Sequence, residues 1–522
     1  MNPKILLLLL SAIARSPVYG QPTVARFDAS CGLVDKDIYC FGGVPAVGDN
    51  TLADNTTMMI DLTICNGNTA AEIKDRWFTE TPNTNGVDTQ PRSFSQNIAL
   101  PDGHRFLLSG GFNGRSGSLA DQTIVYDVLT KKWSKYANFE DGSFGNRQIY
   151  YASTVQVPDL GIGFYGGFEQ NINPSWTMGT GQNLTKANFN KGVSRVVGYP
   201  KMTFLNLNAS TFPWSIPSQS GAPTVYSAHQ TSIYDSTSKN VYFFGGEYYD
   251  LDDPQQEHPT AIRHSFSSSL VYNVETGSWG NQTWGGANPS SRKYHTTTLL
   301  PSKRDILLYG GESKEGAVAD VCYVLNLDTK QWVQQTMEGL LATEYIRTRH
   351  SAVLVDTSNT LFILFGKNSA SVAVNDMLML NVTDPRNISR YETYYDSMRW
   401  SLVGPQSEAS SRTPLIVGVS VGGVIAVALL VGFAIYFWRK RRAGTKSNDM
   451  QRIQYAKGPV EAAGGRLERN RMPGQRPDNY SPMVARPSYL RDDEATLIGS
   501  DEAPATRIVM ALKPSNNRYH HG

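Results

Sequence analysis

Histidines are the side chains in this sequence best suited to binding a metal or transferring a proton. Six of them precede residue 400, namely His104, His229, His258, His264, His295 and His350. A copper centre needs several nitrogen, oxygen or sulfur ligands held around one ion. No two of these histidines stand in a local ligand pattern, so the sequence itself predicts no catalytic residue, no metal site and no cofactor.

The acidic stretch EYYDLDD, from Glu247 to Asp253, is a second candidate for metal chemistry. It lacks the ligand spacing and the closing glutamate of an EF-hand loop. The sequence also carries no glycine-rich phosphate loop, zinc pattern or nucleophile elbow. We therefore expect a solvated acidic loop at this position, and binding rather than catalysis becomes the main hypothesis.

Glycine pairs that close apolar runs divide the chain into similar units. The pairs are Gly42-Gly43, Gly110-Gly111, Gly166-Gly167, Gly245-Gly246 and Gly310-Gly311. A sixth run, LFILFGK, keeps Gly366 and carries Lys367 where the second glycine would stand. Regular units continue with another apolar run and a tryptophan, as in YVLNLDTKQW, which ends at Trp332. We expect the glycines to adopt backbone conformations closed to other residues, and the tryptophan to fill space between sheets.

Each unit contains four short β segments bounded by turn residues, and helical periodicity is almost absent from residues 21 to 400. A four-stranded unit cannot bury both of its faces alone, so neighbouring units must stack. The order of strand, GG, strand with Y-D/N-x-x-T-x-x-W, preceded by an R-x-x-H opening, resembles the kelch repeat from roughly Phe27 to Trp400. That resemblance implies an all-β fold, a six-bladed kelch-type β-propeller, which we assign to residues 21–404.

The loops of a propeller form a rigid binding face, and regular blades would gather the openings of their first strands around an axial funnel. The funnel residues that we predict are Arg147, Arg292, His295, Arg349 and His350. Kelch-type propellers also include secreted fungal oxidases that resemble galactose oxidase. A membrane-tethered copper oxidase is therefore an alternative, because His229, His295 and His350 occupy the opening strands of units four, five and six.

The two ends of the chain predict a single-pass type I membrane protein. Residues 1–20 have the lysine, apolar run and small residues of a secretory signal peptide. Residues 415–438 carry no charge and precede four basic residues, which predicts a transmembrane helix with a cytosolic C-terminus and the N-terminus outside or lumenal. Residues 405–414 would form a stalk. Residues 439–522, with 16 Lys and Arg against 9 Asp and Glu, would form a disordered basic tail.

Cysteines and glycosylation motifs are consistent with an oxidising compartment for the body. Cys31 and Cys40 flank the DK turn symmetrically, so we favour a disulfide between them, while the pairing of Cys65 and Cys322 stays open. Asn-x-Ser/Thr motifs predict glycosylation at Asn55, Asn183, Asn208, Asn281, Asn381 and Asn387.

Two short patterns in the tail resemble clathrin-adaptor signals. YSPM fits a Tyr-x-x-apolar signal through Tyr480 and Met483, and DEATLI fits an acidic dileucine signal through Asp493, Leu497 and Ile498. The predicted partners are clathrin adaptors for the tail and an extracellular or lumenal protein or glycan for the propeller. Nucleic acid is not expected, because the chain before residue 439 carries a net charge of about −5.

The whole layout resembles single-pass membrane kelch-repeat proteins of filamentous fungi that are associated with the cell wall or cell surface. The leading hypothesis is a non-catalytic, glycosylated receptor or adhesion protein of the plasma membrane. A sorting receptor of the endosomal or vacuolar membrane is the first alternative, because of the two tail patterns. The copper oxidase is the second alternative.

Overall fold

The computed structural model describes residues 23–48, 52–113, 118–140, 147–170, 194–195, 198–209, 211–249, 261–337 and 342–397. The predicted signal peptide, stalk, transmembrane helix and tail lie outside these residues. So do Asn183, His258, most of the acidic stretch and the two adaptor-like patterns. Over the ranges given, none of the helices has both the length and the apolar character needed to cross a bilayer.

Within the described ranges, the chain builds six sheets of at least four strands, and the all-β prediction is confirmed. The sheets are numbered 1 to 6 along the chain, and neighbouring strands within each of them run antiparallel. Sheet 5 has one additional strand, β25 (Gly285–Gly286), which pairs in parallel. Sheet 1 contains β2 (Ser30–Val34), β3 (Asp37–Phe41), β5 (Thr57–Ile60) and β6 (Phe78–Glu80). Sheet 2 contains β7 (Gln96–Ala99), β8 (Arg105–Ser109), β9 (Thr123–Asp127) and β10 (Lys132–Lys135). Sheet 3 contains β12 (Ser153–Val157), β13 (Gly161–Gly166), β16 (Tyr199–Leu205) and β17 (Trp214–Ser215). Sheet 4 contains β19 (Thr231–Asp235), β20 (Asn240–Phe244), β23 (Ser268–Asn273) and β24 (Ser278–Thr283). Sheet 5 contains β26 (Thr296–Leu299), β27 (Asp305–Tyr309), β30 (Cys322–Asn326) and β31 (Gln331–Gln334). Sheet 6 contains β32 (Ser351–Val355), β33 (Thr360–Leu364), β34 (Met377–Asn381) and β35 (Ser389–Arg390).

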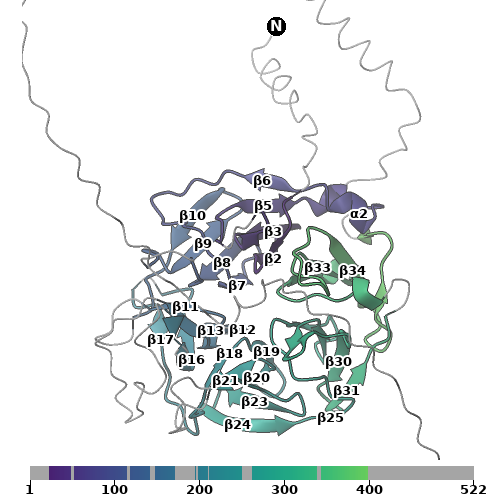
Figure 1. Ribbon diagram of the computed structural model, residues 1–522. Coiled ribbons are helices and arrows are strands. Elements are labelled where there is room, and N and C mark those ends of the chain that lie inside the picture. Colours follow the sequence, from purple (N-terminus) through teal and green to yellow (C-terminus); the bar gives the residue numbers. More distant parts are fainter. Residues whose placement is uncertain are drawn as a thin grey trace, which may run out of the picture. The chain divides into compact units, whose positions relative to one another are not determined.

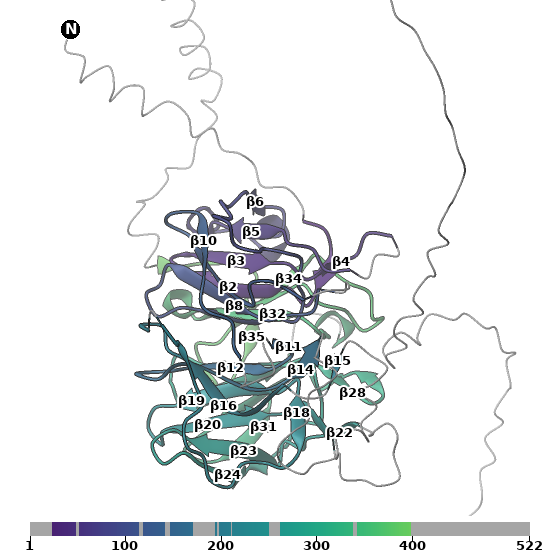
Figure 2. The ribbon, with the colours of Figure 1, turned by 90° about the vertical axis from the view of Figure 1, so that its left-hand side faces the viewer.

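Shorter elements lie in the connections between these strands. The short strands are β1 (Arg26–Phe27), β4 (Val44–Pro45), β11 (Gln148–Tyr150), β14 (Phe168–Gln170), β15 (Ser194–Arg195), β18 (Tyr226–Ala228), β21 (Glu247–Tyr249), β22 (Ala261–Arg263), β28 (Glu312–Ser313) and β29 (Gly316–Ala317). The helices are α2 (Ala70–Ile73) and the 3-10 turns η1 (Leu62–Ile64), η4 (Ala342–Glu344) and η5 (Asp356–Ser358). In Figure 2 the labels of β4, β14, β18, β22 and β28 lie on one side of the sheets. We call this side, formed by the segments after the glycine pairs and before the first strands, the loop face.

The first strands of the six sheets lie around a common centre (Figure 1). Each is a neighbour of the next in the order β2, β7, β12, β19, β26 and β32, and β32 is in turn a neighbour of β2. Hydrophobic cores fill the spaces between successive sheets, and one of them joins sheet 6 to sheet 1 through residues such as Met58 and Phe362. The second strands are almost continuously apolar because both of their faces are buried. In β8, Phe106 and Leu108 pack against sheet 1 and Leu107 packs against sheet 3.

Tryptophans pack against the preceding sheet, as the repeat pattern predicts. Trp133 of β10 lies 5.3 Å from Phe41, and Trp77, just before β6, lies 5.1 Å from Phe365, measured between ring centroids. Both tryptophans are almost completely buried. A large aromatic side chain at this point fills the widening gap between two sheets and contributes strongly to their packing.

The glycine pairs mark the point where each sheet meets the next. In each of the six sheets, the N–H of the second glycine donates to the backbone carbonyl oxygen of the residue four positions before the first strand of the next sheet. The donors and acceptors are Gly43 and Arg92, Gly111 and Ile149, Gly167 and Ser227, Gly246 and Arg292, Gly311 and Arg347, and Gly366 and Arg26, at 2.8–3.1 Å. A Cβ on the first glycine of the second pair, Gly110, would lie 1.8 Å from the Ile149 oxygen, and its φ is +60°. Only glycine therefore allows this approach without displacing the neighbouring sheet.

The sixth unit differs from the sequence prediction. Gly366 occupies the place of the second glycine, since its N–H donates to the Arg26 carbonyl oxygen at 2.9 Å. Phe365 takes the place of the first glycine and adopts its left-handed backbone, with a φ of 59°. Lys367, expected at the second glycine, lies one residue further on and pairs with Thr348. The sequence prediction placed Gly366 at the first glycine position, and this was wrong because the apolar Phe365 looks like the last residue of the strand.

Sheets 1 and 6 are each built from one continuous segment, and the N-terminal segment bridges them. Arg26 pairs with Pro45 in β4 and forms a second bridge with Val374 of the sixth unit. The Ser351 hydroxyl donates to the Ala29 carbonyl oxygen at 2.6 Å. The first and last sheets are thus joined through main-chain contacts as well as through a shared core.

A disulfide joins Cys31 and Cys40, which lie directly opposite each other in β2 and β3. Cys65 and Cys322 are buried in two different hydrophobic cores, so they do not pair with each other. The remaining two cysteines therefore act as small apolar side chains in the packing of their sheets.

Candidate functional site

Six residues with a left-handed backbone surround the centre of the molecule at the loop face. Each stands two residues before the first strand of its sheet, and none is glycine. They are Asp28, Phe94, Tyr151, His229, Tyr294 and Arg349, with φ between 54° and 59°. We call them the axial ring.

Backbone hydrogen bonds link the axial ring from one sheet to the next. The N–H of a ring residue donates to the carbonyl oxygen of the ring residue of the preceding sheet in five of the six steps, at 3.0–3.3 Å. The step that closes the circle is among them, because the Asp28 N–H donates to the Arg349 carbonyl at 3.0 Å. The left-handed turn is what aims each N–H at its neighbour. The six side chains are thereby brought to one place.

Holding bulky side chains in this conformation is unfavourable. A residue with a Cβ in a sparsely populated backbone region costs on the order of 1–3 kcal/mol, and such residues cluster at functional sites. Glycine would adopt the same turn without that cost. The presence of aromatic and charged side chains at all six positions therefore points to a role for the side chains themselves.

Aromatic side chains of the axial ring pack against one another. The rings of Phe94 and Tyr151 have centroids 4.1 Å apart, and those of Tyr151 and His229 are 3.9 Å apart. Tyr294 lies 4.7 Å from His229 and 5.5 Å from Tyr151. Phe94 and Tyr151 keep part of their surface exposed, whereas Tyr294 and His229 are buried.

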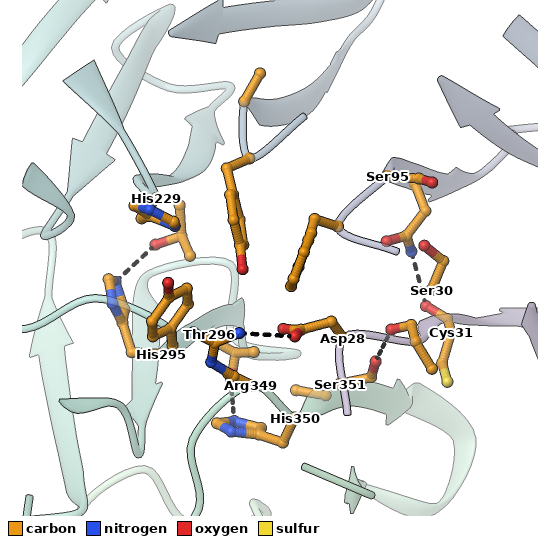
Figure 3. A pocket seen from close by; sticks show the side chains of 18 of the residues that line it. Asp28, Ser30, Cys31, Ser95, His229, His295, Thr296, Arg349, His350 and Ser351 are labelled. Atoms are coloured by element: carbon orange, nitrogen blue, oxygen red, sulfur yellow. Dashed lines mark hydrogen bonds and ion pairs between the residues drawn. The ribbon is translucent and has the colours of Figure 1, made fainter. Parts of the chain in front are cut away.

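An ion pair crosses the ring between sheets 6 and 1. Arg349 Nη1 lies 3.2 Å from Asp28 Oδ2, and both side chains are largely buried. The Arg349 guanidinium also stacks 4.0 Å from the centroid of Tyr294, in a cation–π contact. Figure 3 shows the pair lying between His295 on one side and Cys31 on the other.

A cavity of about 260 Å³ lies within the ring and continues along the first strands. Beyond the ring residues its lining is mostly small and polar. The lining residues of the first strands and their approaches include Ser30, Asn97, Gln230, Thr231, Thr296 and Ser351. Neutral hydrogen-bonding groups thus surround a space whose mouth carries the aromatic side chains and the ion pair.

His295 and His350, two of the predicted funnel residues, line this cavity and connect adjacent sheets. His295 Nε2 lies 3.2 Å from Thr231 Oγ1, and His350 Nε2 lies 2.9 Å from Thr296 Oγ1. Burial, together with nearby Arg292 for His295, lowers the pKa of each imidazole to about 3. Both are therefore neutral at physiological pH.

His229 lies one position earlier than these two histidines, in the axial ring itself. Its Nε2 is 3.4 Å from Glu247 Oε1. Burial holds the pKa of His229 well below its usual range, and the positive charges of Lys293 and Arg349 lower it further. Glu247, expected in a solvated loop, is instead buried and pairs with Arg263 and with Lys293, the latter at 3.5 Å. The loop prediction is wrong at this residue because β21 carries it into the interior.

Arg349 of the predicted funnel lies in the axial ring, but Arg147 and Arg292 lie outside the cavity lining. Arg147 is buried and forms two contacts of 2.6 Å with Glu169. Arg292 is completely buried and donates to the Gly310 carbonyl oxygen at 3.2 Å. These two arginines therefore hold the loops in place. Both arginines stand too early in the sequence to face the centre. The residue that faces it is Tyr151, four positions after Arg147, or Tyr294, two positions after Arg292.

Sequence reasoning missed Asp28, Phe94, Tyr151 and Tyr294. A signal existed, because an aromatic residue follows Arg92 and Arg292 at the same distance of two residues. That recurrence only acquires meaning once the left-handed turn before each first strand is known. Among the side chains that the structure describes, no group of three or more His, Cys, Asp or Glu is arranged to hold a metal ion.

An all-β protein of stacked four-stranded units, with a polar cavity at their centre, is the class that this fold and site define. Residues 259–412 match a family model, the KLHDC2/KLHL20/DRC7 Kelch-repeats domain. The match supports a kelch-repeat assignment, and domains of this type are typically non-catalytic and bind proteins. None of the curated proteins matches the chain.

Proposed function

We propose that the chain is a recognition protein whose six sheets form a six-bladed kelch-type β-propeller and whose axial ring binds an extracellular or lumenal ligand. The observation that carries the proposal is the axial ring. Six costly left-handed residues place aromatic and charged side chains around one cavity at the loop face. Loops on a rigid scaffold are where binding residues concentrate.

Two circles of hydrogen bonds support six blades. The glycine circle, formed by the N–H groups of the second glycines and Gly366, has six donors and returns from Gly366 to Arg26. The axial ring, linked by hydrogen bonds in five of its six steps, returns from Asp28 to Arg349. A circle that returns to its first unit after six steps supports a propeller of six blades. Radial closure also protects the edges of the inner strands.

A type I membrane arrangement remains part of the proposal, on the basis of the sequence of residues 1–20 and 415–438. The described glycosylation motifs are compatible with it. Their asparagines are exposed at Asn55, Asn208, Asn281 and Asn387 and half-buried at Asn381. A glycan needs a surface asparagine, so none of these five motifs is ruled out by burial.

The binding proposal can be tested with full-length protein displayed on cells. Fluorescent neutral polysaccharides and biotinylated secreted proteins serve as probes. The variant is Phe94→Ala, in the half-exposed part of the ring, and the control is Leu129→Ala, an exposed residue in the turn between β9 and β10 at the other end of its sheet. We expect at least tenfold weaker binding of a probe for the ring variant alone. Equal binding by both variants and the wild type would refute a role for the ring.

A second candidate function is a sorting receptor, favoured by the Tyr480 and Leu497 patterns in the tail. The double variant Tyr480→Ala with Leu497→Ala should then accumulate at the plasma membrane, because adaptor pockets would lose both anchors. Quantitative surface labelling measures this directly. An unchanged distribution between surface and internal membranes would retire the idea.

A further inference from the structure

We propose that the axial cavity binds a single uncharged sugar residue of a neutral glycan. The inference rests on the proposed function and narrows its ligand to one chemical class. Four features of the cavity lead to it: the matching of its charges, its neutral polar lining, the aromatic side chains at its mouth, and its size.

The charges at the cavity are already matched within the protein. Arg349 is paired with Asp28 at 3.2 Å and stacked on Tyr294 at 4.0 Å. A cationic ligand at the mouth would be repelled by this guanidinium, and an anionic ligand would have to compete with the Asp28 carboxylate. Further charged side chains near the ring also have partners in the protein, because Glu247 pairs with both Arg263 and Lys293. An uncharged ligand is the one that these pairs accept without being broken.

The groups left for a ligand are neutral hydrogen-bond donors and acceptors. Gln230 at Oε1 and His350 at Nδ1 are among the lining side chains that are more than nine-tenths buried and lack a hydrogen bond at one atom. An unsatisfied buried polar atom costs about 1–3 kcal/mol, so each such atom calls for a partner. Hydroxyl groups suit both, since a hydroxyl donates to an amide oxygen and either donates to or accepts from an imidazole nitrogen.

Aromatic side chains at the mouth supply the apolar part of the site. The rings of Phe94 and Tyr151 pack against each other with centroids 4.1 Å apart, and both are partly exposed. A pyranose ring combines hydroxyls around its edge with apolar C–H groups on its faces, and the C–H faces pack well against aromatic rings. Few other neutral ligands present both kinds of surface at once.

The volume limits the ligand to one sugar residue. At about 260 Å³ the cavity is smaller than the roughly 300–1,000 Å³ of pockets that take drug-sized molecules. A folded peptide segment or an oligosaccharide would not fit inside it. A terminal sugar can enter while the rest of its chain lies across the loop face.

Saturation-transfer NMR on full-length protein, in a detergent without sugar headgroups, tests the proposal. The probes are the methyl glycosides of glucose, mannose, galactose and N-acetylglucosamine, with methyl glucuronide as the anionic and methyl glucosaminide as the cationic probe. We expect saturable binding of at least one neutral glycoside and little of the charged ones. Affinity should fall at least tenfold in Phe94→Ala and in Gln230→Leu, and stay unchanged in Leu129→Ala.

Several results would overturn the sugar proposal. These are tighter binding of a charged glycoside, no saturable binding of any neutral glycoside by folded protein, or neutral binding that survives both cavity variants. Far-ultraviolet circular dichroism and the thermal midpoint establish that the variants are folded. If sugars fail while a secreted protein still binds in a Phe94-dependent way, the sugar proposal falls and the recognition function stands. If no probe binding depends on Phe94, both fall.

Discussion

Replacing Gly110 with alanine should weaken the junction between sheets 2 and 3. The new Cβ would lie 1.8 Å from the Ile149 oxygen and 2.9 Å from its carbonyl carbon, so backbone must move. The left-handed φ of +60° adds a conformational cost of about 1–2 kcal/mol for a residue with a Cβ. Displacing Ile149 also weakens its 2.9 Å hydrogen bond from the Gly111 N–H, which is worth about 0.5–1.5 kcal/mol. The expected total loss in the free energy of unfolding is about 1.5–3.5 kcal/mol.

Gly103→Ala provides a matched control in the same sheet. Gly103 has a φ of +80° in the turn between β7 and β8, and a Cβ there would meet no atom within 4 Å. It should lose only the conformational part, about 1–2 kcal/mol. Urea unfolding of the full-length protein, followed by tryptophan fluorescence, measures both losses. If the two variants lost the same stability, the close approach of neighbouring sheets would not be the reason for the glycine pair.

Three further experiments test the packing and electrostatics. Phe365→Gly removes the backbone strain of the sixth unit, but it also removes a buried aromatic ring that is stacked on Trp77. Because the lost packing outweighs the relieved strain, the free energy of unfolding should fall by about 2 kcal/mol. A gain in stability would contradict the packing role of Phe365. The wild type should lose stability as pH falls from about 7 to 5, because His295 and His350 stay neutral when folded, with pKa values near 3, whereas the unfolded chain takes up protons near pH 6.5. His295→Gln with His350→Gln should reduce that slope in urea titrations at each pH, and an unchanged slope would show that these two histidines do not contribute to it. Arg292→Met removes a completely buried guanidinium from its 2.6 Å contact with the partly exposed Asp320 and from the Gly310 carbonyl oxygen, and should cost about 3–5 kcal/mol in the same assay. Arg386→Ala, in an exposed ion pair, should change nothing measurable. Equal effects of the two substitutions would refute the framework role of Arg292.

The sequence predicts the strands and the tryptophan packing because both follow from local patterns. Apolar runs bounded by turn residues become the second strands, and Trp133 lies against Phe41 of the preceding sheet. The sixth unit was misaligned at Gly366 because an aromatic residue, Phe365, occupies a position that glycine holds elsewhere. Only the approach of the next sheet identifies which residue takes the left-handed turn.

The candidate site was only partly predictable. His295, Arg349 and His350 line the cavity, whereas Arg147 and Arg292 turn toward Glu169 and the Gly310 carbonyl instead. The direction of a side chain near the centre depends on a backbone turn two residues before the strand, which apolar periodicity does not reveal. Phe94 and Tyr151 were missed for the same reason, since a half-buried aromatic residue in a connection looks like framework.

Hydrogen exchange at Gly366 tests the central claim, a closed circle of six sheets with a binding ring at its centre, most directly. Its N–H donates to the Arg26 carbonyl, the one bond of the glycine circle that joins the last unit to the first. Mass spectrometry of full-length protein, with fragmentation to single residues, compares its exchange rate with that of Gly111 inside the circle. The closed arrangement predicts similar, strong protection of both amides. Exchange of Gly366 at the rate of an open loop, with Gly111 still protected, would contradict closure and with it the common centre on which the site depends.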